Sequence, residues 1–310
     1  MTVSHSFRGQ RAARSGRAAL VALLCIPWLS DAPAAEAVAA ERNEPPAIAT
    51  IVEGDAVVLR DEARGALSSG VPLQAEDIVH TGPDGLVRLE LSDGTAIDLG
   101  PGTRAQFLPP AARRGEPLRV LYLLEGMAKV SANAVERASG DDTPAPAGLR
   151  AELFDAPALD GVFVVRVAPT RIEAFTESGA LRLALREAKP IPIAVEVAEG
   201  RYYLMDGELP GQVQPVPPRP FVDALPQAFM VTLPKRRDRF ASSPVELELA
   251  TPVTYEDVSA WLQAEPAMRW LYLRRWRGRL SDPEFRKAIA ENLSRHPEWR
   301  RTIRSGRYRK

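Results

Sequence analysis

Apolar and charged residues alternate on both sides of Asp93-Gly94, which predicts a β-hairpin at this point. Successive side chains of a strand point to opposite faces, so the apolar residues of the two runs are expected to pack together on one face. These residues are Val87, Leu89, Leu91, Ile97 and Leu99. By the same rule Arg88, Glu90 and Asp98 lie on the other face, and we expect that face to meet water.

Short strand-like runs continue along the chain between glycine-containing turns. They cover residues 120–124, 162–167, 171–176 and 193–197. Strands at this spacing predict a mainly β fold, which would be a sandwich, a roll or a solenoid-like body. We expect the β domain to span residues 50–210, with residues 132–146 as a loop inserted between two β halves.

The pattern becomes helical after a proline-rich segment. Residues 211–220 are expected to form a linker, because closely spaced prolines lack ladder donors and favour extended backbone. Three short amphipathic helices and a small helical domain are expected over residues 221–310. Capping signals stand at Thr254 and Asp257 for the first helix and at Asp282 for the third. The middle helix has the apolar stripe Met268, Leu271, Tyr272 and Trp276.

The first residues have the form of an export signal. Four arginines between positions 8 and 17 precede an apolar run from Ala18 to Leu29, and small residues follow it. The run is about a dozen residues, shorter than the roughly 20 that cross a bilayer, so cleavage is expected after Ala34, Ala35 or Ala37. Residues 1–34 are then a signal peptide and residues 35–49 a flexible leader. We expect a periplasmic or secreted protein.

Export also limits the chemistry that is open to the chain. The only cysteine, Cys25, would leave with the signal peptide, which excludes a disulfide framework and a thiol nucleophile. An exported protein meets little nucleic acid, so no nucleic-acid partner is expected.

Three segments of the β region, in order and at their spacing, resemble the FecR domain family. They are residues 52–58 with Gly54, residues 73–82 with the Asp77-x-Val79-x-Thr81 step, and residues 91–103 with the Asp93-Gly94-Thr95 hairpin. The resemblance spans about residues 50–210 and implies an extracytoplasmic β domain that binds and senses rather than catalyses. Signalling members carry an anti-sigma segment and a transmembrane helix before this domain. Here the export signal stands in that place, so the chain resembles exported FecR-domain proteins of Gram-negative bacteria, and direct signalling to a sigma factor is not expected.

Charge is strongly segregated although the 40 Lys and Arg balance the 40 Asp and Glu. Residues 266–310 carry fourteen basic and four acidic residues, a balance of +10, whereas residues 35–265 carry 22 and 35, a balance of −13. The helical periodicity places Trp270, Arg274 and Arg277 together, opposite the apolar stripe. Guanidinium groups bind phosphate or carboxylate, and an indole suits a wet apolar boundary, so these three residues are a candidate patch for an anionic surface or partner.

Three interpretations of this basic region stay open. It could dock on the acidic β domain of the same chain, contact an envelope protein, a glycan, anionic membrane lipid or lipopolysaccharide, or remain solvated. The final residues, from Arg300 onward, are expected to be frayed.

Material for catalysis is sparse. Glu76-Asp77 and Asp141-Asp142 are paired carboxylates, but neighbours on a strand point to opposite faces and loop carboxylates are usually solvated. His80 is expected to form a structural hydrogen bond near a turn, and His296 to meet carbonyls at a helix end. We expect no metal and no cofactor. The leading hypothesis is a non-enzymatic binding or sensing module of the cell envelope, and the alternatives are a carbohydrate-active hydrolase and a periplasmic structural or assembly factor.

Overall fold

The computed structural model describes residues 47–108, 118–132, 147–157, 159–186, 193–207 and 210–306. The contacts divide the chain at Asn43, and all the described residues belong to the unit Glu44–Lys310. The expected signal peptide, most of the leader and the inserted loop lie outside the described residues.

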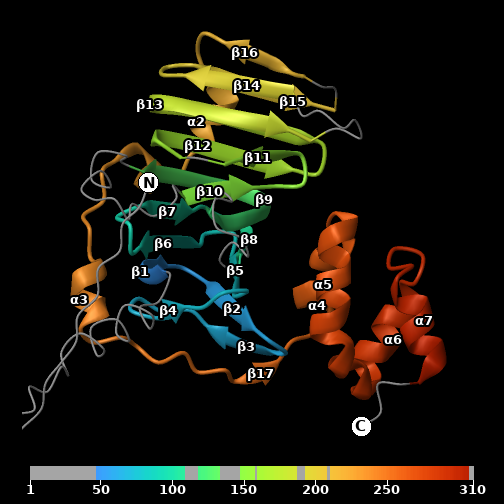
Figure 1. The fold of residues 1–310 in the computed structure, drawn as a ribbon. Helices are drawn as coiled ribbons and strands as arrows, with labels where there is room; N and C mark the ends of the chain where they lie inside the picture. The colour runs from blue at the N-terminus through green and yellow to red at the C-terminus, as the bar shows by residue number, and fades with distance from the viewer. Residues whose placement is uncertain are drawn as a thin grey trace, which may run out of the picture. The chain divides into compact units, whose positions relative to one another are not determined.

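The expected mainly β fold with small C-terminal helices is confirmed (Figure 1). The strands of the first half are β1 (Ala47–Glu53), β2 (Ala56–Arg60), β3 (Ala63–Ala66), β4 (Pro72–Leu73), β5 (Ile78–Thr81), β6 (Leu86–Leu91), β7 (Ala96–Leu99), β8 (Arg104–Phe107) and β9 (Leu118–Ala132). Those of the second half are β10 (Ala147–Arg150), β11 (Phe154–Ala156), β12 (Gly161–Ala168), β13 (Arg171–Leu185), β14 (Ile193–Ala198), β15 (Tyr202–Asp206), β16 (Gln212–Gln214) and β17 (Thr251–Pro252).

Hydrogen bonds arrange these strands in two connected sheets. Sheet A has the order β4-β1-β6-β7-β9-β12-β13-β15-β16. Sheet B has the order β17-β3-β2-β5-β8-β9-β10-β11-β13-β14. One apolar core draws side chains from both sheets, and Leu89 of β6 and Leu123 of β9 are both fully buried in it.

The two longest strands connect the sheets, and each changes sheet at a glycine. Strand β9 pairs in sheet B up to Glu125 and in sheet A from Gly126 onward, and β13 pairs in sheet A up to Gly179 and in sheet B from Ala180. Gly126 has φ +101°, and a Cβ built there would lie 2.4 Å from Cα of Thr103. Glycine is therefore required at this corner, because it tolerates positive φ and lets Thr103 approach.

The predicted hairpin is confirmed in its register, since Val87 pairs with Leu99 and Leu89 with Ile97. Strand β1 begins at Ala47, within the stretch expected to be leader, and Ala47 is fully buried. Strand β16 lies within the expected linker and pairs with β15. Both ends of the β region therefore extend beyond the expected boundaries.

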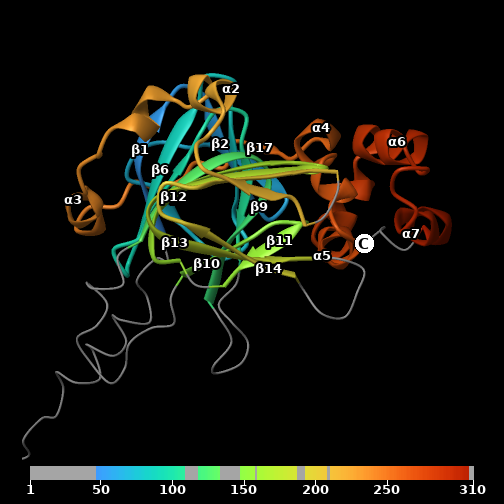
Figure 2. The ribbon, with the colours of Figure 1, turned by 90° about the horizontal axis from the view of Figure 1, so that it is seen from above.

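Helices α2 (Arg219–Asp223) and α3 (Arg237–Ala241) lie between strands β16 and β17 along the chain, and the other helices follow β17 (Figure 2). These are α4 (Tyr255–Val258), α5 (Pro266–Trp276), α6 (Pro283–Glu291) and α7 (Trp299–Ser305). The 3-10 turns lie at Gln227–Met230, Trp261–Gln263 and Arg277–Ser281. Thr254 and Asp257 form the expected capping box at α4, and Asp282 caps α6. Among the described residues no helix has the length and apolar character that crossing a bilayer requires.

The C-terminal helices share a core with sheet B. Trp261 and Trp276 are fully buried in a cluster that also contains Leu59, Ile78 and Tyr122 of the β region. Burying an aromatic side chain between the helices and the β region stabilises the packing of the two by about 2 to 3 kcal/mol for each ring. The helices are thus packed onto the β region through their aromatic side chains.

Candidate functional site

The exposed face of α5 carries the residues expected to form a binding patch. Trp270 is 57% exposed, whereas the other tryptophans of the described residues, Trp261, Trp276 and Trp299, are 0 to 1% exposed. Arg274 and Arg277 are also exposed and follow Trp270 by four and seven residues, which are helical spacings. Neither guanidinium group has a hydrogen bond or ion pair within the described parts of the chain. The predicted trio is therefore exposed, with Trp270 and Arg274 in α5 and Arg277 at the start of the following 3-10 turn.

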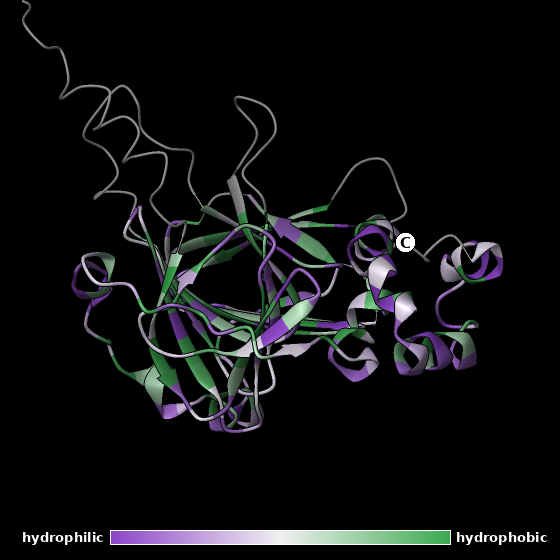
Figure 3. Cartoon of the chain, turned by 90° about the horizontal axis from the view of Figure 1, so that it is seen from below, coloured by the Kyte–Doolittle hydropathy of each residue, from purple (hydrophilic) through white to green (hydrophobic). Residues whose placement is uncertain are grey.

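Helix α7 adds arginines that the sequence argument missed. Trp270 lines a shallow hollow of about 730 Å³ together with Arg300, Arg301 and Arg304. The final residues were expected to be frayed, but residues 299–305 form a helix whose Trp299 is buried. The spacing of Trp299 and Ile303, one helical turn apart, was the signal for this helix. Figure 3 shows hydrophilic residues along these C-terminal helices.

The expected apolar stripe of α5 is wrong at one position. Met268, Tyr272 and Trp276 are buried, but Leu271 is 45% exposed. Leu271 borders a pocket between α5 and the β region. The buried stripe of α5 is narrower than the spacing suggested, because Arg275 makes the contact with the turns of the β region. The guanidinium group of Arg275 donates to the carbonyls of Leu59, Asp61 and Glu76 at 3.0, 3.2 and 2.5 Å.

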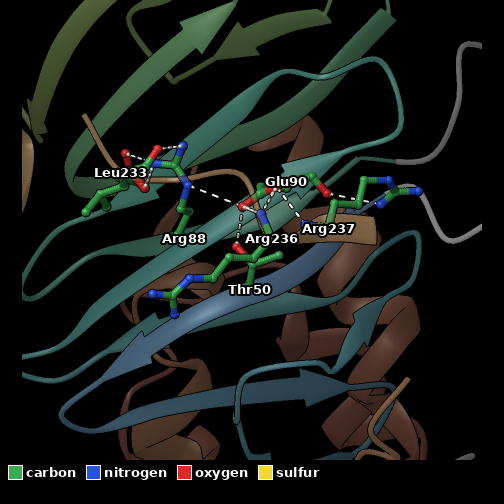
Figure 4. Close-up of polar contacts among 7 residues, drawn as sticks. Thr50, Arg88, Glu90, Leu233, Arg236 and Arg237 are labelled. Atoms are coloured by element: carbon green, nitrogen blue, oxygen red, sulfur yellow. Dashed lines mark hydrogen bonds and ion pairs between the residues drawn. The ribbon is translucent and has the colours of Figure 1, made fainter. Parts of the chain in front are cut away.

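The face of sheet A expected to meet water is instead covered by the chain. Arg88, Glu90 and Asp98 are 5%, 3% and 2% exposed, because residues 229–237 pass over them. The backbone N–H groups of Arg236 and Arg237 each donate to the carboxylate of Glu90, at 2.9 to 3.0 Å. The Thr50 hydroxyl donates to the same carboxylate at 2.7 Å (Figure 4). The alternation was correct, but it could not reveal what covers the polar face.

Arg88 and Lys129 complete the contacts with this covering segment. Arg88 binds both oxygens of Asp98 at 2.9 Å and the Leu233 carbonyl at 3.5 Å, and Lys129 donates to the Phe229 carbonyl. Burial raises the pKa of Asp98, and the Arg88 guanidinium partly offsets that effect. Charged side chains of the sheet thus bind backbone groups of an extended segment.

The two histidines have structural partners. Nε2 of His80 accepts a hydrogen bond from the Trp261 indole at 2.8 Å. His296 is fully buried, with Nε2 2.8 Å from the Tyr255 hydroxyl and Nδ1 3.4 Å from the Leu262 carbonyl. Burial lowers the pKa of both imidazoles, that of His80 to about 3. Both rings are neutral near pH 7.

Glu76 and Asp77 lie just before strand β5 and not on it, so the strand rule does not apply to them, but their burial differs. Asp77 is buried and binds Arg60 through two hydrogen bonds of 2.9 and 2.7 Å, whereas Glu76 is exposed on the preceding turn. Asp141 and Asp142 lie outside the described residues. Within the described ranges no three His, Cys, Asp or Glu side chains are grouped to hold a metal ion.

No protein-family model and no curated protein matches the chain. Two solved structures that resemble it are of a "putative anti-sigma factor" from Parabacteroides distasonis, 16% and 15% identical, with TM-scores of 0.33 and 0.32. Each alignment covers 44% of this chain and 57% of the other, so the chain spans little more than half the length of the structures it matches. A likeness at these TM-scores establishes neither a shared fold nor a shared function.

Proposed function

We propose that this protein is a non-enzymatic, exported module of the cell envelope, with a FecR-like β domain, that binds an anionic lipid surface through its C-terminal helices. The single observation that carries the proposal is the exposed Trp270 beside arginines that have no ion-pair partner among the described residues. An exposed indole is costly in water unless a partner covers it, and Trp is favoured where a wet surface meets an apolar one.

The arginine geometry supports an anionic partner. Trp270 shares its hollow with Arg300, Arg301 and Arg304 of α7, and the exposed Arg274 and Arg277 follow Trp270 along the chain by four and seven residues, outside that hollow. Guanidinium groups bind phosphate through paired hydrogen bonds, and basic residues near an anionic membrane contribute about 1 kcal/mol each. Membrane phosphates, including those of lipopolysaccharide, fit this surface.

Contact with the chain's own β region uses other basic residues. Arg275 binds carbonyls of the β turns, and Arg150 and Arg186 of the β region bind Glu265 at the start of α5, at 2.8 and 2.6 Å. The exposed arginines around Trp270 are thus distinct from those that hold α5 in place, and they stay available to a second molecule.

The experiment is co-sedimentation of the mature protein with vesicles of phosphatidylglycerol and phosphatidylcholine, at low and high salt. The triple substitution of Arg300, Arg301 and Arg304 by Gln should weaken binding to the anionic vesicles about a hundredfold, because each charge contributes about 1 kcal/mol to binding. The matched control is Arg182→Gln, which removes an exposed charge of the β region. Equal binding to both vesicle types, or equal losses in the triple variant and the control, would refute the proposal. Binding to an acidic glycan without vesicle binding would favour the glycan alternative.

A further inference from the structure

A second, smaller pocket lies between α5 and two turns of the β region. Its volume is about 400 Å³, within the range of small-molecule sites. The two linings share no residue, so this pocket is distinct from the hollow beside α7. The acidic residues of the pocket come from the two turns, its arginines come from α5, and its other residues come from α5, strand β8 and the position after β8. The residues are Leu108, Met268, Leu271 and Tyr272 on the apolar side, and Asp61, Glu76, Gln106, Arg274 and Arg275 on the polar side.

The walls of this pocket are held rigidly. Asp61 and Glu76 have φ of +53° and +71°, and they are the two residues other than glycine with positive φ in the described ranges. The carbonyls of both residues accept hydrogen bonds from Arg275, and that of Asp61 also accepts one from the Trp276 indole at 3.0 Å. Tight turns and fixed carbonyls leave little freedom to the two acidic residues. A ligand would meet a preformed site, which lowers the entropic cost of binding.

Gln106 is fixed in the same way. Its Oε1 accepts from the buried Tyr272 hydroxyl at 2.7 Å, and its Nε2 donates to the Glu76 carbonyl at 3.3 Å. The Gln106 amide thus links Tyr272 on the apolar side of the pocket to the turn that carries Glu76, which fixes the distance between these two sides.

The pocket presents both signs of charge, and the guanidinium of Arg275 interacts electrostatically with Asp61 and Glu76 without forming an ion pair with either carboxylate. Asp61 and Glu76 come from the β turns, and Arg274 comes from α5. Across the described residues, none of these three side chains makes a hydrogen bond or an ion pair, and all three are exposed. A ligand that carries one positive and one negative group could therefore satisfy both walls at once.

We propose that this pocket binds an α-amino acid with a large apolar side chain. The carboxylate would bind Arg274, the ammonium group would lie between Asp61 and Glu76, and the side chain would cover Leu271 and Met268. Leu271 supports this assignment, because its 45% exposure at the rim leaves apolar surface that such a side chain removes from water. The proposal does not rest on membrane binding, and Arg274 lines this pocket and not the hollow of Trp270.

The test uses L-leucine as the probe, with the full-length mature protein in calorimetry. Two analogues each lack one charge: leucinamide lacks the carboxylate, and 4-methylpentanoate lacks the ammonium group. Arg274→Gln should weaken leucine binding about tenfold or more, the usual effect of losing a charged hydrogen bond, and should leave leucinamide binding unchanged. Glu76→Gln should weaken leucine binding similarly and leave 4-methylpentanoate binding unchanged.

Arg182→Gln is again the matched control, because it removes a charge far along the sequence from the pocket. Both pocket substitutions are at exposed positions, so the variants are expected to fold. Absence of leucine and phenylalanine binding to the unmodified protein would overturn the inference, as would equal losses for leucine and both analogues in each variant. Because Glu76 takes no part in the Trp270 surface, loss of leucine binding in Glu76→Gln with intact vesicle binding separates this proposal from the proposed function.

Discussion

The Trp261 indole donates its N–H to Nε2 of His80 at 2.8 Å, which joins a C-terminal 3-10 turn to strand β5. The acceptor nitrogen carries no proton, so His80 is the neutral tautomer with its hydrogen on Nδ1. Protonating this ring would remove the acceptor and place a charge in a buried aromatic cluster. The contact between helices and β region therefore depends on pH.

We predict that stability falls on acidification because of His80. Burial, followed by the nearby Arg104 and Arg64, lowers its pKa from 6.5 to about 3, so between these values the unfolded chain binds a proton that the folded chain does not. The stabilisation is complete above about pH 6.5 and is lost as the pH falls toward 3. At about 1.4 kcal/mol per pKa unit, this shift corresponds to a loss of up to about 5 kcal/mol in urea unfolding over this window.

His80→Gln is the informative variant, because an amide oxygen still accepts from the indole and does not titrate. Its stability should change less with pH than that of the unmodified protein, and the remaining slope includes His296, whose pKa is also lowered by burial. An unchanged pH profile in His80→Gln would show that the ring does not control this contact.

We predict that Gly126→Ala is far more damaging than Gly102→Ala. Both glycines have positive φ, but a Cβ at Gly102 meets nothing within 4 Å, whereas one at Gly126 would collide with the Thr103 backbone at the corner of β9. Positive φ alone costs about 1 to 2 kcal/mol, and the collision should raise the loss at Gly126 above about 3 kcal/mol. Urea unfolding of the two variants measures the difference. Similar losses would mean that the corner adjusts without strain.

We predict that Trp270→Ala leaves stability within about 0.5 kcal/mol, whereas Trp276→Ala costs about 3 to 5 kcal/mol. The two side chains belong to one helix, but Trp270 is 57% exposed and Trp276 is fully buried with its indole bonded to the Asp61 carbonyl. Thermal unfolding tests stability, and vesicle binding at matched temperature tests function. A large loss of stability in Trp270→Ala would mean that its exposure here does not reflect the protein in solution.

Much of the fold could be predicted because local pattern decides it. The β6–β7 hairpin follows from alternation about Asp93-Gly94, and the cap at Thr254 follows from the spacing of two polar residues. What could not be predicted depends on residues distant in sequence. Arg88 and Leu233 are 145 positions apart, and no periodicity in β6 indicates that a later segment will cover its polar face.

The candidate site was predictable to the same extent. Trp270 and Arg274 are exposed in α5, and Arg277 is exposed at the start of the 3-10 turn that follows it, as their spacing suggested. That spacing could not bring Arg304 of α7 to the hollow of Trp270, nor set Arg274 beside Asp61, because those neighbours depend on how separate elements pack.

The segment that covers sheet A should open locally without global unfolding when Glu90 is replaced. From Met230 to Pro252 no residue is buried, so backbone bonds to Glu90 and Arg88, and those from Val245 and Ala250 to the β region, carry much of its attachment. In Glu90→Gln the carboxylate that accepts from Arg236 and Arg237 becomes a weaker, uncharged acceptor, which should cost about 1 to 3 kcal/mol in that segment. Amide hydrogen exchange of residues 230–240 should rise about tenfold or more, while exchange in β9 and β13 stays close to that of the unmodified protein.

Glu246→Gln is the matched control, because Glu246 is an exposed carboxylate of the same segment. If both variants exchange alike, Glu90 does not hold the segment. If β9 and β13 also lose protection in Glu90→Gln, the buried charges support the whole sheet and not its covering segment alone. Faster exchange confined to residues 230–240 would establish that a polar sheet face is kept dry here by backbone contacts rather than by apolar packing.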